Sequence, residues 1–541
     1  MGGSKVEKFR ISVRSLVEFL LHSGDIDGGK GGMADKEAMQ LGSRIHRKIQ
    51  GSMGAGYRPE VSLKAEIVKE TFTLFVEGRA DGILEQDGRI TVDEIKGVYR
   101  SLDAMEKPDL LHLAQAKCYA AIYGSEQKLD VISVQMTYCN LETEEIRRFV
   151  QEFSVKELKS WFDELTEQYC KWCEMQVKWK TCRQESIHAC VFPFPYREGQ
   201  KQLVAAVYRT IAHRKKLFIQ APTGVGKTIS TVFPTVKAVG ENLGEKIFYL
   251  TAKTIARTVA EEAFGILEHQ GLRYKTVTLT AREKICCCEQ PECNPRDCPR
   301  AKGHFDRIND AVYDMITHRT YFGREALEEQ ARQWNVCPFE LSLALAQLAD
   351  VVVCDYNYVF DPFVAIDALM QGGAALLIDE AHQLAPRVQD NASAAVSAKQ
   401  LRGLRRDAGQ ALGRKHALYK ALTAALRALE EAARTEEFAA GRLEKPPEDL
   451  NAAMEGLLDA AGGALAEGAG PPASDAFSLA ACWQYAAGRL DERYAVLTEG
   501  AEKTARIELF LLCAAQDILE KTKKARGAVF FSATLAPFEA A

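Results

Sequence analysis

The sequence predicts an α/β protein whose main part is a parallel sheet covered by helices. Between residues 196 and 379, short β-rich runs alternate with helical stretches, which is the pattern of a parallel sheet with helical crossovers. These runs are residues 217–220, 246–251, 351–354 and 374–379. A last apolar run, residues 528–531, resumes strand character after a long helical stretch. The chain has 541 residues, enough for three or four domains of roughly 100 to 200 residues each.

Changes in composition and helix-breaking prolines divide the chain into successive regions. The first region alternates helical and strand patterns and ends before Pro193 and Pro195, which disfavour helix. A later region is rich in Ala, Leu, Glu and Arg at helical spacing and predicts a mostly helical insertion. The expected domains are 1–190, an α/β domain; 191–382, the sheet domain with a cysteine-rich insertion at 281–337; 383–526, the helical insertion; and 527–541, a return to the sheet domain.

The overall composition is that of a globular protein and excludes a membrane protein. Apolar residues make up 47% and charged residues 26%, and no apolar run approaches the roughly 18 to 20 residues that cross a bilayer. Residues 11–21 contain Arg14 and Glu18, so they predict an amphipathic helix and no export signal. We therefore expect the protein in the cytoplasm of a bacterium. A net charge of -5 leaves any nucleic-acid binding to local patches.

The segment APTGVGKT, residues 221–228, is a phosphate-binding loop in its required context between a strand and a helix. Gly224 and Gly226 allow backbone N–H groups to close around phosphate oxygens. Lys227 places a positive charge on the β and γ phosphates of ATP, and Thr228 offers a hydroxyl to Mg²⁺. A plain glycine-rich turn before a helix is the alternative, and the preceding strand, the lysine and the threonine together disfavour it.

A second motif, Asp379-Glu380-Ala381-His382, ends the apolar run 374–379. A buried parallel strand delivers such carboxylates to the sheet edge where ligands of open α/β folds bind. We expect Asp379 to hold Mg²⁺ and Glu380 to orient and deprotonate an attacking water. An acidic pair at a strand end is often only a helix cap, so the functional interpretation depends on the phosphate loop.

Cysteine is concentrated in one place. Five of the fifteen cysteines fall within thirteen residues: Cys286, Cys287, Cys288, Cys293 and Cys298. The spacing, continued to Cys337, predicts four metal ligands: Cys286, Cys293, Cys298 and Cys337. Zinc sites usually show two tight C-x2-4-C pairs, which are absent, so looser spacing favours a 4Fe-4S cluster, with zinc as the alternative. The first ligand is ambiguous among three consecutive cysteines; we expect Cys286, and no ligating role for Cys287 or Cys288.

These motifs together resemble a superfamily 2 helicase, and the cysteine insertion narrows the resemblance to the XPD/DinG-like group. Ser532-Ala533-Thr534 matches a later motif of these enzymes, while Ala221 stands where the strict phosphate loop has glycine. The resemblance implies a RecA-like motor domain over residues 191–382, with an iron-sulfur insertion and a helical arch. Arg197 and Gln200 look like the adenine-recognising segment. Three further residues match a motif that binds the DNA strand: Thr251, Lys253 and Thr254.

The resemblance implies an ATP-dependent DNA helicase that moves 5′ to 3′ along single-stranded DNA and acts on forked DNA. It also implies ATP, Mg²⁺ and a 4Fe-4S cluster as cofactors. The pattern FFSATLAP, residues 530–537, is followed by only four residues. We therefore expect the second motor domain to be missing, and the chain as given to bind nucleotide weakly and to unwind nothing. DNA repair is the expected context, and the sequence names no protein partner.

In the N-terminal region two predicted strands, residues 71–85 and 89–96, are joined at Gln86-Asp87-Gly88, a strong hairpin signal. Because side chains alternate along a strand, Glu94 and Lys96 share a face while Asp93 points away. Asp81 on the first strand can supply a second carboxylate. The carboxylates would bind Mg²⁺ or Mn²⁺, and Lys96 would position the hydrolytic water or stabilise phosphate charge.

Other residues extend this pattern to a known family. His46, in GSRIH, is an additional candidate metal ligand, and Gln115 and Tyr119 lie four apart on one helix face. In order and spacing these pieces resemble the RecB-type PD-(D/E)xK nucleases, which implies a nuclease-like fold for residues 1–190. Cys170, Cys173 and Cys182 are expected to pack in a helix and not to hold a second cluster. Two alternatives to the helicase stay open: a DNA- and nucleotide-binding protein without turnover, and a nuclease gated by an ATPase.

Overall fold

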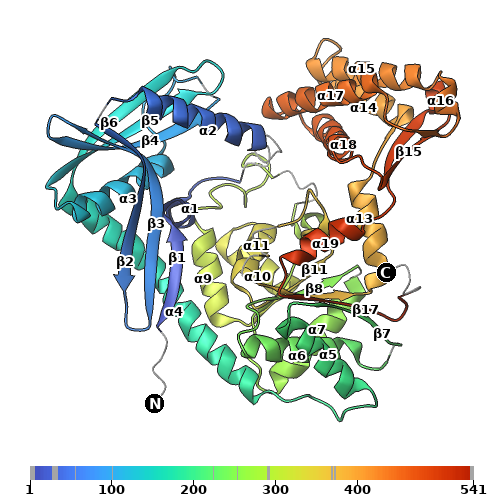
Figure 1. Ribbon diagram of the computed structural model, residues 1–541, viewed down its shortest axis with the longest axis horizontal. Helices are drawn as coiled ribbons and strands as arrows, with labels where there is room; N and C mark the ends of the chain where they lie inside the picture. The colour runs from blue at the N-terminus through green and yellow to red at the C-terminus, as the bar shows by residue number, and fades with distance from the viewer. Residues whose placement is uncertain are drawn as a thin grey trace. The chain divides into compact units, whose positions relative to one another are not determined.

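The computed structural model describes residues 6–26, 35–54, 56–99, 101–222, 224–252, 254–288, 293–366, 370 and 373–535. The chain forms two compact units (Figure 1). The first comprises Met1–Ile26, Gly31–Cys182 and Lys302–Asp310; the second comprises Asp27–Lys30, Arg183–Ala301 and Ala311–Ala541. In the described part of the chain, no helix has both the length and the apolar character needed to cross a membrane.

The first unit is built on a six-stranded mixed sheet with the order β1-β3-β4-β5-β6, in which β2 also pairs with β3. Its strands are β1 (Glu7–Ser12), β2 (Tyr57–Val68), β3 (Phe72–Gln86), β4 (Arg89–Val98), β5 (Val131–Asn140) and β6 (Ile146–Ser154). Its helices are α1 (Val13–Leu21), α2 (Asp35–Ser52), α3 (Leu110–Glu126) and α4 (Val155–Ala189), the last of which continues into the second unit. The sheet and α3 enclose the larger core of this unit.

The amphipathic helix predicted over residues 11–21 begins two residues later, at Val13. Ile11 instead belongs to β1, which pairs in parallel with β3. The helix starts where it does because the Ser12 hydroxyl accepts a hydrogen bond from the Ser15 amide at 3.0 Å, which caps the first turn. Its apolar face buries Val13, Leu16 and Val17.

The predicted hairpin is confirmed as β3 and β4. Gln86 pairs with Arg89, so only two residues form the loop. Asp87 and Gly88 both have positive φ, 53° and 73°, as a two-residue type I′ turn requires. The turn fixes the register, and the register places Glu94 and Lys96 on one face of β4.

The second unit contains a seven-stranded parallel sheet with the order β10-β9-β11-β8-β12-β17-β7. Its strands are β7 (Lys216–Gln220), β8 (Ile247–Thr251), β9 (Thr276–Thr278), β10 (Tyr321–Phe322), β11 (Val351–Asp355), β12 (Ala375–Asp379) and β17 (Gly527–Ser532). The five strands predicted from sequence are therefore confirmed within one or two residues at each end. The last of them, β17, inserts between β12 and β7, which brings Ser532 next to Gln220, the residue before the phosphate loop.

Helices surround this sheet on both sides, as expected for a parallel sheet (Figure 1). They are α5 (Gln200–Ala212), α6 (Lys227–Gly240), α7 (Thr254–His269), α8 (Arg282–Ile285), α9 (Ile308–His318), α10 (Arg324–Trp334), α11 (Pro338–Leu348), α12 (Asn357–Phe360) and α19 (Ala515–Lys523). One side of the core gathers buried side chains from α6 and the central strands, among them Val236, Leu377 and Val529.

Residues 383–526 are mostly helical, and they also contain a small antiparallel sheet that the helical composition did not indicate. The helices are α13 (Leu384–Ala392), α14 (Ala398–Ala411), α15 (Ala417–Ala432), α16 (Glu436–Ala439), α17 (Glu448–Ala466) and α18 (Pro471–Ala487), with 3-10 turns at Ala381–Gln383 and Glu502–Thr504. The sheet has the order β13-β16-β15-β14, from β13 (Ala394–Ser397), β14 (Arg442–Leu443), β15 (Tyr494–Glu499) and β16 (Arg506–Leu511). Burial alternates along β16, as in a strand with one face in a core.

Candidate functional sites

The phosphate loop lies between β7 and α6, as its sequence context predicted. Gly224 and Gly226 have φ of 83° and 74°, a conformation that side chains with a Cβ rarely adopt. Gly226 is also crowded: a Cβ there would lie 2.9 Å from Nε2 of Gln200. Lys227 begins α6, with Thr228 in its first turn, so both face the loop at a helix N-terminus suited to phosphate.

The Lys227 ammonium group is held against the loop itself. Its Nζ donates to the carbonyl oxygens of Ala221 at 2.8 Å and Pro222 at 3.3 Å. Phosphate oxygens are stronger acceptors than these carbonyls because they are charged. The lysine is thus positioned to exchange backbone acceptors for the phosphates of a nucleotide.

Asp379 ends β12 and is tied to the neighbouring strand β8 by a tyrosine. The Tyr249 hydroxyl donates to Oδ2 of Asp379 at 2.8 Å, and it also bonds with the Thr228 side chain. Burial raises the pKa of Asp379 above its usual value, and the bond from Tyr249 opposes that rise. Through these two bonds, the fully buried Tyr249 hydroxyl joins the two residues that we expect to hold Mg²⁺. Sequence reasoning missed Tyr249, and its only signal was a polar atom on an otherwise apolar central strand.

Glu380 sits just beyond the strand in a strained backbone conformation, with φ of 50°. Its Oε2 accepts a hydrogen bond from the Ser532 hydroxyl at 3.0 Å. His382 Nδ1 lies 2.8 Å from the same hydroxyl and 3.4 Å from Glu380 Oε2. The Tyr356 hydroxyl donates to the carbonyl oxygens of Asp379 and Glu380 and holds the bend. Two motifs that lie far apart in sequence therefore meet at one carboxylate.

The upstream residues Arg197 and Gln200 reach the same loop. Arg197 donates through its guanidinium to the carbonyl oxygen of Gly224. Gln200 Nε2 donates to the carbonyl of Val225 at 3.2 Å and to the hydroxyl of Ser230 at 3.0 Å, while its Oε1 accepts from the Arg197 amide at 3.0 Å. These bonds place the expected adenine-recognising segment against the phosphate loop.

The expected strand-binding residues are described only in part. Thr251 ends β8 and is fully buried. Lys253 lies outside the described residues, and Thr254 begins α7 but its side chain is not among those described. Their role with DNA stays a prediction.

The cysteine-rich insertion brings thiols near one another. Cys288 Sγ lies 3.8 Å from Cys298 Sγ, and the Cys288 amide donates to Cys286 Sγ at 3.5 Å. Burial raises the pKa of Cys337 to about 11, and Cys293 is one of its charged neighbours. Cys288, which the sequence interpretation left out of the ligand set, thus lies in contact with Cys298, and the choice of ligands stays a prediction.

This donor set fits a thiolate-preferring metal without choosing between the two alternatives. Two thiolates on one tetrahedral zinc, each about 2.3 Å from the ion, lie about 3.8 Å apart. Iron-sulfur clusters are also held by cysteine thiolates, one on each iron of a cubane. Throughout the described ranges, however, no three His, Cys, Asp or Glu side chains are arranged to hold a metal ion.

In the first unit, Asp81 on β3 lies close to His46 on α2. Asp81 Oδ2 accepts a hydrogen bond from the Ile95 amide at 2.7 Å, and Oδ1 lies 3.4 Å from His46 Nδ1. Gln50, one turn after His46 on α2, donates to the Asp81 carbonyl at 2.9 Å. Contact with Asp81 raises the pKa of His46 even though burial alone would lower it.

Glu94 and Lys96 form an ion pair on the predicted shared face, with Oε1 and Nζ 2.9 Å apart. Lys96 also donates to Gln115 Oε1 at 3.1 Å, and Gln115 donates to the Tyr119 hydroxyl at 3.4 Å. Glu94 is 2% exposed, and its Oε2 is buried with no hydrogen-bond partner among the described residues. Burial, with Asp81 second, raises the pKa of Glu94 to about 8. A cation would satisfy this orphaned oxygen, so the residues present fit a divalent metal.

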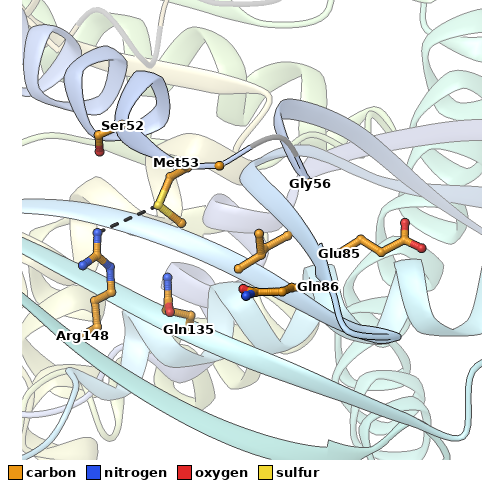
Figure 2. A pocket seen from close by; sticks show the side chains of 9 residues that line it. Ser52, Met53, Gly56, Glu85, Gln86, Gln135 and Arg148 are labelled. Atoms are coloured by element: carbon orange, nitrogen blue, oxygen red, sulfur yellow. Dashed lines mark hydrogen bonds between the residues drawn. The ribbon is translucent and has the colours of Figure 1, made fainter.

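Asp93 points to the opposite face, as predicted. Its carboxylate is fully buried and accepts hydrogen bonds from Tyr57, Gln135 and Thr137 at 3.1, 3.0 and 2.6 Å. A pocket of about 540 Å³ opens next to Gln135, between the end of α2 and the β3–β4 hairpin. Figure 2 shows the Arg148 guanidinium bonded to the sulfur of Met53 across this pocket. Asp93 is thus a structural acceptor, separate from Glu94.

Part of the chain is similar to known helicases. Residues 267–401, which include the cysteines from Cys286 to Cys337 and Asp379-Glu380-Ala381-His382, match the family model DEAD_2. The chain is 21% identical over 224 residues to the general transcription and DNA repair factor IIH helicase subunit XPD of Dictyostelium discoideum, covering 36% of this chain and 29% of that protein. It is 24% identical over 249 residues to the ATP-dependent helicase DinG of Mycobacterium tuberculosis, covering 38% and 37%.

Other matches agree with these. The regulator of telomere elongation helicase 1 homolog of Caenorhabditis elegans is 23% identical over 246 residues, covering 38% of this chain and 25% of that protein. A solved structure titled XPD_Helicase aligns with 64% of this chain and 59% of its own at 16% identity, with a TM-score of 0.41, a level that does not itself establish a common fold. The alignments to these curated relatives span about a quarter to two fifths of the relatives' length. Over a little more than a third of this chain, these sequence matches are all to DNA repair, telomere-elongation or DinG helicases.

Proposed function

We propose that this chain supplies the ATP-hydrolysing motor of a DNA helicase of the XPD/DinG type, acting 5′ to 3′ on single-stranded and forked DNA. The observation that carries the proposal is the convergence of four segments at one sheet edge. The phosphate loop, Asp379-Glu380, Tyr249 and Ser532 come from β7, β12, β8 and β17, and they are joined by hydrogen bonds. A catalytic centre at the carboxyl ends of parallel strands is the expected location in this architecture.

Each residue then has a stated task. Lys227 binds the β and γ phosphates, while Thr228 and Asp379 would hold Mg²⁺, which when bound neutralises phosphate charge. Glu380 orients the attacking water and accepts its proton. His382 and Ser532, which both contact the Glu380 carboxylate, would set its position. Arg197 and Gln200 would recognise adenine, and Thr251, Lys253 and Thr254 would hold the DNA strand.

Replacing the proposed base tests the motor. Glu380→Gln should lower DNA-stimulated ATP hydrolysis at least a hundredfold and leave binding of a fluorescent ATP analogue within about twofold, because the amide cannot accept the proton. Asp390→Asn, at an exposed position on α13, is the matched control and should change neither quantity. Turnover that persists in Glu380→Gln would remove this residue from its role. Both quantities are measured on the full-length protein, where binding of nucleotide without turnover would favour the non-catalytic alternative.

We further propose that the first unit is a metal-dependent DNA nuclease, supported by the orphaned buried oxygen of Glu94 beside Asp81 and Lys96. Lys96→Ala should eliminate Mn²⁺-dependent cutting of single-stranded DNA while nucleotide binding stays unchanged. Lys8→Ala, an exposed lysine of the same sheet, is the control. Equal cutting by Lys96→Ala and the parent would refute the assignment, and the absence of cutting in the parent would favour a structural role for the unit.

The metal of the cysteine-rich insertion is proposed to be a 4Fe-4S cluster. Iron and acid-labile sulfide measured in anaerobically purified protein should approach four of each per chain. Stoichiometric zinc with no sulfide would select the alternative. Cys288→Ser and Cys286→Ser, compared in the same assay, decide which of the two thiols is the first ligand.

A further inference from the structure

A short segment that follows the cysteine-rich insertion belongs structurally to the nuclease-like unit. Residues 302–310, here called the tether, start four positions after Cys298 and belong to the same compact unit as residues 1–26. We propose that the tether couples the folding state of the cysteine-rich insertion to the nuclease-like unit by docking on the loop that follows α1. The proposal does not depend on either enzymatic activity or on the identity of the metal.

Reciprocal hydrogen bonds hold the tether on this loop. The Gly24 amide donates to Asp306 Oδ1 at 2.8 Å, and in return the Gly303 amide donates to Asp25 Oδ1 at 2.6 Å. The Phe305 amide donates to the Gly24 carbonyl at 3.0 Å. Each partner therefore supplies a carboxylate that accepts a backbone N–H from the other. Bonds of this kind to a charged acceptor are stronger than those between neutral groups.

Aromatic packing adds an apolar contact beneath these bonds. The rings of His22 and Phe305 are stacked, with centroids 3.9 Å apart and 22° between their planes. The neighbouring His304 side chain is 1% exposed, so the tether buries one of its side chains beside this stack. The stack adds to the hydrogen bonds, because the half-buried Phe305 ring would lose its contact with the exposed His22 ring on separation.

The loop side of the contact is itself anchored in the core of the unit. Asn309 at the end of the tether donates through Nδ2 to the carbonyl of Phe19 at 2.5 Å. Phe19 meets Tyr169 and Trp172 of α4 edge to face, with centroids 5.6 and 5.1 Å away. Displacing the tether would thus disturb a chain of contacts that ends in α4.

The polypeptide chain connects the tether to the cysteine-rich insertion, and it connects the docked loop to α2. On one side, the Ala301 amide bonds to the Cys298 carbonyl at 3.0 Å, so the last cysteine of the dense cluster lies one turn before the tether. On the other side, the docked loop precedes α2, the helix that carries His46. Linkage is reciprocal: if an ordered cysteine region favours tether docking by some factor, docking favours the ordered cysteine region by the same factor.

Hydrogen exchange of the intact chain, read by mass spectrometry, tests both directions. Phe305→Ala and Asp306→Ala should each speed exchange of the amides at residues 19–25 about tenfold, since docking holds those amides closed. Phe305→Ala should also speed exchange at residues 293–301. Cys298→Ser should speed exchange at residues 19–25 from the other end. Lys302→Ala, an exposed tether side chain whose carbonyl bond is retained, is the matched control and should change none of these rates.

A second variant separates docking from general loss of fold. His22→Ala removes the other half of the stack, and the double variant with Phe305→Ala should speed exchange no more than either single variant, because both delete one contact. Unchanged exchange at residues 19–25 in the tether variants would overturn docking. Altered exchange in those variants but none in Cys298→Ser would overturn the coupling. If the increases in exchange rate of the two single variants multiply in the double variant, the His22–Phe305 stack is not the basis of docking.

Discussion

The Tyr249 hydroxyl offers the sharpest test of the nucleotide site. Tyr249→Phe deletes one oxygen and keeps the ring, which packs against Phe531 with centroids 6.0 Å apart. What is lost is the 2.8 Å bond to Asp379 and the bond with Thr228. A hydrogen bond to a charged group contributes about 1.5–3 kcal/mol, and each 1.4 kcal/mol is a factor of ten. The Mg²⁺ concentration needed for half-maximal ATP binding should therefore rise about ten- to hundredfold.

The direction follows from the electrostatics. Burial already raises the pKa of Asp379, and the bond from Tyr249 counters that rise by stabilising the carboxylate. Without the hydroxyl the carboxylate is less favoured and less well oriented, so it binds a cation more weakly. Titration of a fluorescent ATP analogue at a series of Mg²⁺ concentrations measures the shift directly. Nucleotide affinity without Mg²⁺ should stay within about threefold.

Tyr274 provides a matched control in the same unit. It is equally buried, but its hydroxyl has no hydrogen-bond partner within the described residues. Tyr274→Phe should leave the Mg²⁺ dependence unchanged and should not lower the free energy of unfolding. A Tyr249→Phe protein that matches the parent at every Mg²⁺ concentration would refute the role assigned to this hydroxyl. Equal shifts in both variants would show a general effect of losing a buried hydroxyl.

Three further predictions concern stability. Asp350→Ala should lower the free energy of unfolding by about 3–5 kcal/mol in urea titrations, because it leaves the Arg183 guanidinium, 2.5 Å away, charged and buried without its partner; a loss under 1 kcal/mol would contradict this. Asp93→Ala should lower the free energy of unfolding by about 2–4 kcal/mol, because three buried donors lose their acceptor. The same variant should leave the Mn²⁺ affinity of the proposed nuclease site unchanged. A tenfold weaker Mn²⁺ affinity would place Asp93 in the metal site. Burial lowers the pKa of His304 from 6.5 to about 4, so between these pH values the unfolded chain binds a proton that the folded chain excludes. About 3 kcal/mol of the free energy of unfolding, present above pH 6.5, should therefore be lost as the pH falls to 4. His304→Gln should remove this loss when unfolding is measured at a series of pH values.

Local patterns were enough to predict much of the seven-stranded sheet and the β3–β4 hairpin of the six-stranded sheet. The phosphate loop lies between a strand and a helix because its glycines permit the tight turn and its lysine begins the helix. Asp87-Gly88 fixed a two-residue hairpin, and strand alternation then placed Glu94 beside Lys96 and Asp93 behind them. These features depend on neighbours within a few positions, which is the range over which sequence patterns carry information.

Contacts between distant segments could not be read in the same way. Ser532 bonds to Glu380 across 152 positions, and the small sheet beside α18 was hidden by the helical composition around it. Cys288 was set aside because three consecutive cysteines look equivalent in sequence, whereas the fold brings this one to Cys298. The tether gave no sequence signal, since its contacts join backbone groups and ordinary side chains that lie about 280 positions apart.

The sequence by itself determined the chemical groups available and the local elements that carry them: a phosphate loop, paired carboxylates, a hairpin with an acid and a lysine on one face, and a dense set of thiols. Tertiary structure decided which of those groups meet. Because β17 lies between β12 and β7, Ser532 reaches Glu380. Because β8 lies beside β12, Tyr249 reaches Asp379. The physical reason is that strand order and docking are set by burial summed over many side chains, a quantity that no short stretch of sequence contains.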